Sequence, residues 1–166
     1  MDNKTFTKSM TILDAENIVK YYKDIRSNEK TKNKFNVFSI FAQWNLKKNI
    51  DILSKEVSSF EELRDEKQKE LNDKYFTDEK SEDKQIEQVV DGEVKMVPGR
   101  QVKEEYMEDF KTEHTNMLTE LYKVAMQKID VELFVIDIDK ELEDVKDADA
   151  LQELNMDDLD FLSIFK

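Results

Sequence analysis

A strong β-hairpin signal lies between two long helical patterns, and this order constrains the fold more than any other feature of the chain. The signal occupies residues 85–97, where Asp91 and Gly92 stand between two short runs rich in β-branched residues. An Asp-Gly pair adopts the left-handed dihedral angles of a two-residue type I′ turn. The flanking patterns cover residues 36–76 and 100–129. We therefore predict a long antiparallel helical hairpin with a β-hairpin at its tip.

Each helical pattern carries a stripe of residues that predicts how the two helices pack. The first stripe steps by alternating fours and threes, as in a coiled-coil seam: Leu46, Ile50, Leu53, Val57, Phe60, Arg64, Lys67 and Leu71. The second stripe is looser: Val102, Tyr106, Phe110, Met117, Leu121, Val124 and Lys128. Pro98 and Gly99 precede the second helix and indicate the joint where the β-hairpin ends.

The two ends of the chain predict a small base. Residues 6–13 and 131–138 read as strands, and Asp14 is expected to cap a short helix that reaches Arg26. A helix of about 30 residues rises about 45 Å, so the second strand cannot reach the β-hairpin and should pair with residues 6–13. An aromatic cluster, Phe35, Phe38, Phe41 and Trp44, is expected to form the core beneath this sheet.

These elements predict a fold class that is mainly α with small β elements (α+β). We expect one domain over residues 1–166, with a base formed by residues 1–50 and 130–166. Residues 51–129 would form a projecting helical arm that carries the β-hairpin.

Charge is unevenly distributed in this acidic chain, whose net charge is −13. Residues 1–50 carry ten Lys and Arg against five Asp and Glu, and residues 130–166 carry three against thirteen. The acidic balance argues against direct nucleic-acid binding, because the chain would gain little from releasing phosphate counterions. No apolar run reaches the roughly 20 residues that span a bilayer, and no signal peptide is evident. We expect a protein that is cytosolic or is packaged from the cytosol.

Residues with catalytic or metal-binding chemistry form no recognisable motif, so we predict a protein that is not an enzyme and that uses no cofactor. His114 is the only histidine and lies mid-helix without a nucleophile set beside it. Asp137 and Asp139, like the group Asp157, Asp158 and Asp160, lack the twelve-residue loop and central Gly of a calcium hand. No metal site is predicted. The absence of cysteine excludes disulfides and zinc–sulfur sites.

The C-terminal residues form a tail that contains both acidic and apolar residues, and two interpretations of its role are open. Two short helices are expected after residue 147, the first marked by Leu151 and Leu154 and the second capped by Asn155. The tail either packs back on the base or lies in the groove of a partner. In the second reading the partner-binding residues are Asp157, Asp158, Leu159, Phe161, Leu162 and Phe165.

The order of elements resembles an uncharacterised family of small acidic bacteriophage proteins. The resemblance covers most of residues 10–166, from the short helix that follows residues 10–14 to the acidic tail. The helix, β-hairpin and helix order is also similar to prefoldin-type chaperone subunits. The first resemblance implies a phage origin, and with it a location in the virion or the host cytoplasm, and it carries no catalytic residues.

Three functional hypotheses follow. The favoured one is a non-enzymatic phage protein, a virion structural, packaged accessory or assembly component that contacts other phage proteins or itself. The alternative is a phage-encoded inhibitor of a host enzyme or defence complex that presents residues 137–160 as an acidic surface. An enzyme is the third hypothesis, and the search for a nucleophile, base and orienting group gives it no support.

Overall fold

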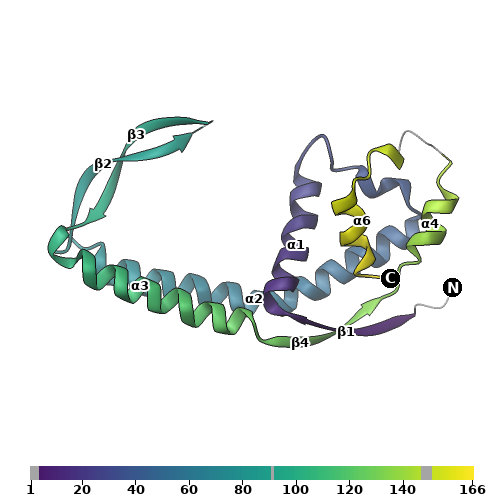
Figure 1. Cartoon of the computed structure of the whole chain (residues 1–166), viewed down its shortest axis with the longest axis horizontal. Coiled ribbons are helices and arrows are strands. Elements are labelled where there is room, and N and C mark those ends of the chain that lie inside the picture. Colours follow the sequence, from purple (N-terminus) through teal and green to yellow (C-terminus); the bar gives the residue numbers. More distant parts are fainter. Residues whose placement is uncertain (1–3, 91, 147–150) are drawn as a thin grey trace. The chain divides into compact units, whose positions relative to one another are not determined.

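The computed structural model describes residues 4–90, 92–146 and 151–166 and shows a mainly helical chain with small β elements (Figure 1). The elements are, in chain order, β1 (Thr5–Thr11), α1 (Ile12–Ser27), the short 3-10 helix η1 (Lys34–Val37), α2 (Ile40–Tyr75), β2 (Ser81–Val90), β3 (Glu93–Val102), α3 (Glu104–Ala125), β4 (Lys128–Phe134), α4 (Ile138–Asp144) and α6 (Met156–Ser163). The predicted fold class is confirmed. No helix in the described part of the chain is long and apolar enough to cross a membrane.

Two compact units make up the chain. The first unit contains Met1–Ser59 and Ala125–Lys166, and the second contains Phe60–Val124. The sequence instead places the base in residues 1–50 and 130–166, so the observed boundaries lie further into the predicted arm. Helix α2 is continuous through the boundary, and its first half belongs to the core of the first unit.

The small sheet of the first unit pairs β1 with β4. The strands are antiparallel and run in register from Thr5 opposite Phe134 to Thr11 opposite Lys128, as the sequence predicts for the base sheet. Both strands are offset from their predicted bounds. β1 ends at Thr11 because this residue is the N-cap of α1, and β4 ends at Phe134, before the unpredicted helix α4 that Asp137 caps.

Helix α1 begins earlier than the sequence suggests. The predicted cap, Asp14, is the third residue of a capping box whose N-cap is Thr11. The Thr11 hydroxyl oxygen accepts from the Asp14 backbone N–H at 3.0 Å, and an Asp14 carboxylate oxygen accepts from the Thr11 backbone N–H at 3.0 Å. The Thr11 hydroxyl also donates to the Asp14 carboxylate at 2.7 Å. This bond and the one from the Thr11 N–H lower the pKa of Asp14, because both favour its charged form.

The long helix α2 begins at Ile40, not at residue 36. The chain first makes the 3-10 helix η1 and an extended residue, Phe38, before Ser39 accepts a hydrogen bond from the Ala42 N–H. This entry changes the predicted aromatic core. Phe35 and Phe38 are buried, whereas the side chain of Trp44 is 53% exposed.

The core of the first unit joins segments that are distant in sequence. Its buried residues come from β1, α1, η1, α2, β4, α4, the C-terminal segment and the residues that connect these elements: Met10, Ala15, Ile18, Val19, Ile25, Phe35, Phe38, Ala42, Leu46, Ile50, Leu53, Val57, Val131, Leu133, Ile136, Ile138, Phe161, Leu162 and Phe165. The ring of Phe161 contacts Tyr21, Tyr22, Phe35 and Phe165, with centroids 5.0 to 6.5 Å apart. The C-terminal helix therefore completes this core.

The second unit contains the predicted β-hairpin. β2 and β3 are antiparallel, from Ser81 opposite Val102 to Val90 opposite Glu93, so the connecting loop has two residues. Gly92 has a φ of 81°, which suits the predicted tight turn. The other loop residue, Asp91, lies outside the described residues, as does the predicted start of a short helix at residues 147–150.

Pro98 and Gly99 do not form a joint before the second helix, because both lie within β3. A proline is tolerated here since both strands of a two-stranded ribbon are edges. Gly99 makes room for the side chain of Ile86 on the other strand, since a Cβ atom at Gly99 would lie 2.4 Å from Ile86 Cδ1. Helix α3 begins only at Glu104.

Helices α2 and α3 lie side by side in the second unit and share a small core (Figure 1). Leu71, Tyr75 and Val102 are buried there. The ring of Phe110 makes edge contacts with Tyr75 and Phe76, with centroids 5.3 and 5.9 Å apart. The later part of the first predicted stripe therefore meets the second, whereas Leu46, Ile50, Leu53 and Val57 belong to the core of the first unit. Lys128 leaves the helix and lies exposed in β4.

Candidate functional site

The C-terminal tail packs into its own unit. Helix α6 follows Asn155, its predicted N-cap, which forms a capping box with Asp158. Phe161 is 5% exposed, and Leu162 and Phe165 are fully buried. The backbone N–H of Ile136 donates to the Phe165 carbonyl oxygen at 2.8 Å, which ties the tail to the segment after β4.

Asp158 is the centre of a buried polar cluster. Its carboxylate accepts from the ammonium of Lys34 at 2.6 Å, from the Tyr21 hydroxyl at 2.8 Å and from the Asn155 backbone N–H at 2.8 Å. Burial alone would raise the pKa of Asp158, but these three donors outweigh it and hold the pKa below its usual value. Burial and the Asp158 charge also raise the pKa of Tyr21. All three donors bind the same buried carboxylate and compensate its loss of solvation, so the cluster stabilises the fold.

The predicted partner-binding residues therefore need correction. Asp158, Phe161, Leu162 and Phe165 belong to the core of the chain, which contradicts their use as an exposed docking peptide. Of the six predicted residues, Asp157 is exposed and Leu159 is half-buried. The aromatic core and the buried ion pair of Asp158 both hold this tail inside the first unit.

Two buried asparagines of α2 hold the end of β4. The side-chain amide of Asn49 accepts from the Phe134 backbone N–H at 2.7 Å and donates to the Phe134 carbonyl oxygen at 2.8 Å. Asn45, one turn earlier, donates to the Val135 carbonyl oxygen at 3.3 Å. Asn49 thus takes the place of a neighbouring strand, because its amide presents the same donor and acceptor as a peptide group.

We expect Asn49→Ala to lower the free energy of unfolding by about 3 kcal/mol, because it leaves the N–H and the carbonyl of half-buried Phe134 without the two bonds from the fully buried Asn49. Urea denaturation followed by circular dichroism measures the loss. Asn72→Ala, at an exposed position of the same helix, is the control and should change the value by less than about 0.5 kcal/mol. Equal effects of the two changes would show that the clamp is not stabilising.

The predicted chemistry-bearing residues do not converge. His114 lies half-buried on α3, where its ring stacks on Phe110 with centroids 5.7 Å apart. Asp137 caps α4, and Asp139 pairs with Lys166 at 2.6 Å. Over residues 4–90, 92–146 and 151–166, no group of three or more histidine or acidic side chains could hold a metal ion.

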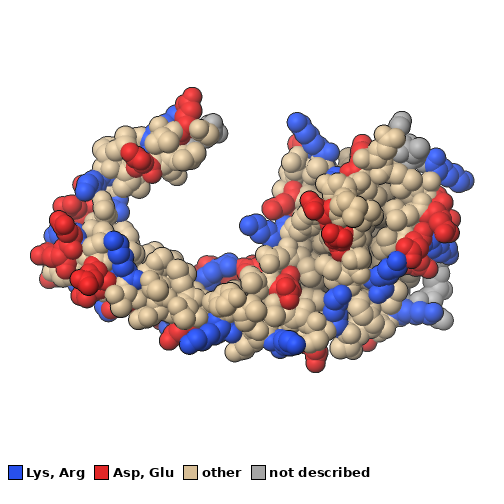
Figure 2. All heavy atoms as spheres, viewed as in Figure 1, with Lys and Arg blue, Asp and Glu red and all other residues tan. Residues whose placement is uncertain are grey.

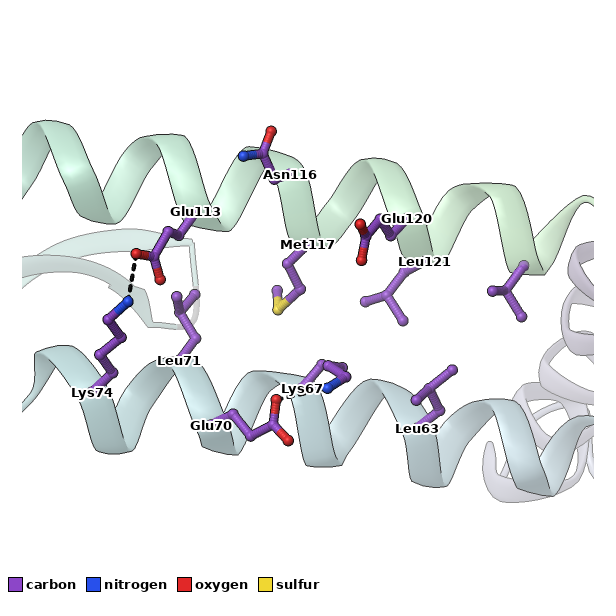
Figure 3. Close-up of a pocket in the computed structure, with 11 residues that line it drawn as sticks. Leu63, Lys67, Glu70, Leu71, Lys74, Glu113, Asn116, Met117, Glu120 and Leu121 are labelled. Carbon is purple, nitrogen blue, oxygen red and sulfur yellow. Dashed lines mark hydrogen bonds and ion pairs between the residues drawn. The ribbon is translucent and has the colours of Figure 1, made fainter.

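An open groove lies between α2 and α3 in the second unit (Figure 3). It has a volume of about 510 Å³. Its apolar lining comes from both helices: Leu63 and Leu71 of α2, and Met117, Leu121 and Val124 of α3. Leu71 and Leu121 are buried, whereas Leu63 and Met117 are half-buried. Two helices alone cannot cover both sides of their shared stripe, and the groove is the side left open.

The rim of the groove is charged. On α2 it carries Lys67, Glu70 and Lys74, and on α3 it carries Glu113, Asn116 and Glu120. Lys74 bonds across the groove to Glu113 at 2.5 Å, and Figure 3 shows these side chains reaching toward each other. The hydrogen bond from Lys74, helped by one from Tyr75, lowers the pKa of Glu113. The α2 wall therefore carries two cations and one anion, Glu70, and both charged residues of the α3 wall are anions.

Other exposed apolar residues lie outside the groove. In the first unit, Ile40 is 87% exposed, and it lines a smaller cavity of about 230 Å³ together with Trp44. In the second unit, Val89, Val94 and Met96 of the β-hairpin are all more than half exposed. Their register puts Val89 opposite Val94 on one face of the ribbon.

The sequence indicated only part of this site. Lys67 and Leu71 belong to the predicted seam, and Met117, Leu121 and Val124 to its partner stripe. The rim residues Glu113 and Glu120 resemble any other surface charges of a helix and were not singled out. Their seven-residue spacing, which matches that of Lys67 and Lys74, is the signal that could have found them.

Comparisons with known proteins add no relative. No protein-family model matches the chain, and neither a curated protein nor a solved structure matches it significantly.

Proposed function

We propose that this chain is a non-enzymatic bacteriophage protein that acts through protein–protein contacts, as a virion structural, packaged accessory or assembly component. The proposal rests on the groove between α2 and α3. Its apolar floor and charged rim are the features by which helices dock in protein interfaces, with apolar anchors at the centre and charges at the edge. The phage origin rests on the resemblance in element order.

The groove suits a partner helix better than a small substrate. Its apolar lining extends along two helices, from Leu63 to Leu71 on α2 and from Met117 to Val124 on α3. Four charged groups at its rim form ion pairs, Lys74 with Glu113 and Lys67 with Glu70. Such pairs frame an interface and set its orientation, because exposed charges steer association more than they add affinity.

Mass spectrometry of purified particles and assembly intermediates from infected cells tests the proposal. We expect the wild-type chain in at least one of these fractions and expect Met117→Lys, which puts a charge on the groove floor, to reduce its amount there at least tenfold. Thr119→Lys introduces the same charge at an exposed position of α3 outside the groove and should leave the amount unchanged. Absence of the wild-type chain from every fraction would overturn the proposal.

An inhibitor with an acidic surface is the second candidate, and the exposed acidic residues around α4 favour it. Asp139, Glu143 and Asp144 are exposed, and Figure 2 shows acidic side chains together over this helix. Asp157 and Asp160 are also exposed, whereas Asp158 is buried and cannot contribute. This surface would imitate the charge of a nucleic acid toward a basic host enzyme or defence complex.

Charge removal distinguishes the two candidates. The variant with Asp139→Asn, Glu143→Gln and Asp144→Asn should lose salt-sensitive binding to a host target if the chain is an inhibitor. The same variant should still enter particles if the groove is the functional surface. Binding that is unchanged by these substitutions and by salt would exclude the inhibitor.

A further inference from the structure

The residues that line the groove form pairs across the two helices. Lys74 of α2 lies opposite Glu113 of α3, as their ion pair shows. Because the helices run in opposite directions, seven residues back along α2 and seven forward along α3 lead to Lys67 and Glu120, two turns further along the groove. Lys67 donates a hydrogen bond to the Glu70 carboxylate, which raises the pKa of Lys67, and the nearby charge of Glu120 adds to this effect.

Apolar pairs alternate with these charged pairs. About one turn further along each helix from Lys74 and Glu113, Leu71 lies opposite Met117. One turn beyond Lys67 and Glu120, Leu63 lies opposite Val124. Four cross-helix levels result: Lys74 with Glu113, Leu71 with Met117, Lys67 with Glu120, and Leu63 with Val124. At every level α2 supplies a cation or a leucine, and α3 supplies an anion or an apolar side chain. The two walls of the groove are therefore complementary to each other.

A surface whose two walls are mutually complementary can pair with a copy of itself. A two-fold axis parallel to the helices lays α2 of one copy over α3 of the other at the same level, so that Lys74 faces Glu113 and Leu71 faces Met117. A two-fold axis perpendicular to the helices instead lays α2 over α2, which places lysine against lysine or against leucine. Only the first arrangement matches charge with charge and apolar with apolar.

We propose that the occupant of the groove is a second copy of this chain, docked groove to groove about a two-fold axis parallel to α2 and α3. The inference rests on the proposed function, since it names the partner of the same surface. The pairing forms a four-helix bundle. This bundle covers Leu63, Met117 and Val124, which the two helices of one copy leave partly exposed. Other proteins would then meet the dimer through surfaces outside the groove.

Charge reversal on each wall tests the pairing by sedimentation equilibrium at about 0.15 M salt, where long-range repulsion between the chains is screened. Lys67→Glu with Lys74→Glu gives a groove with only acidic charges, and Glu113→Lys with Glu120→Lys removes its acidic wall. We expect each double variant alone to dimerise at least tenfold more weakly than the wild-type chain. We expect an equimolar mixture of the two to form a heterodimer. Glu108→Lys, at an exposed position of α3 outside the groove, should dimerise as the wild-type chain does.

Cysteine cross-linking tests the direction of the axis, and the chain has no cysteine of its own to interfere. In a mixture of Lys67→Cys and Glu120→Cys chains, oxidation should give a disulfide-linked heterodimer far faster than it links either chain to itself. Preferential self-linking of either variant would overturn the parallel axis.

A wild-type chain that stays monomeric at all concentrations and forms no cross-link would overturn self-pairing. The particle experiment separates this failure from that of the proposed function. If Met117→Lys is lost from particles while the wild-type chain is monomeric, the groove binds a different protein and the proposed function stands. If the wild-type chain dimerises through the groove but is absent from every particle fraction, the self-pairing stands and the proposed function fails.

Discussion

Phe165→Ala is expected to lower the free energy of unfolding by about 3 to 5 kcal/mol, because it opens a large cavity in the core of the first unit. The ring of Phe165 is fully buried and makes an edge contact with Phe161, with centroids 5.5 Å apart. Urea denaturation at neutral pH measures the change. A loss of this size would show that the tail is an internal structural element.

Two further substitutions control this prediction. Phe165→Leu keeps most of the apolar volume and should cost clearly less than Phe165→Ala. Ser163→Ala changes an exposed residue of the same tail and should alter stability by less than about 0.5 kcal/mol. If Phe165→Ala lowers the free energy of unfolding by less than about 1 kcal/mol, the tail is not packed as described. The interpretation of the tail as a docking peptide would then be favoured.

Lys34→Met is expected to lower the free energy of unfolding by about 3 kcal/mol at neutral pH. It removes the ion-pair partner of Asp158, whose side chain is fully buried, and methionine keeps the apolar contacts of the lysine stem. Urea denaturation measures the loss. Lys32→Met, which removes an exposed lysine that pairs with Glu29, should cost less than about 1 kcal/mol.

The stability loss of Lys34→Met should depend on pH in a defined direction. In the wild-type chain the pKa of Asp158 is below its ordinary value of 3.8, so its contribution is complete above that pH and is lost as the pH falls through the folded-state pKa. Without Lys34, burial dominates and raises that pKa, so the folded variant gains relative stability as the carboxyl is protonated. The difference between the two proteins should therefore shrink as the pH falls toward about 4. A difference that is constant with pH would contradict the role assigned to the Lys34–Asp158 pair.

The local sequence pattern predicted those helices and strands that depend on interactions between residues close together in the chain. The Asp-Gly pair between β-branched runs predicted the β-hairpin, because its turn needs a residue with positive φ and Gly92 supplies it. The length of the helices predicted which strands could meet, and β1 pairs with β4. Element ends were less certain. Thr11 and Asp14 are both residue types that cap helices, and the structure shows that Thr11 is the N-cap of α1.

Tertiary packing decided the residues whose partners lie far along the chain. Asp158 looks like one of many surface carboxylates, and only the approach of Lys34 and Tyr21 makes its burial stable. Asn49 becomes a substitute strand only because α2 crosses the end of β4. Trp44 belongs to an aromatic run that predicts a core, yet the turn before α2 leaves it exposed.

The sequence by itself therefore determined the order of the long helices and the strands, the β-hairpin, the base sheet and the absence of cysteine chemistry. Each of these depends on residues within a few positions of one another, or on chain length. The tertiary structure alone decided that the tail is buried and that the groove between α2 and α3 carries matched charges. Both depend on which side chains meet across long sequence separations, and periodicity assigns a residue to a face without naming what lies opposite.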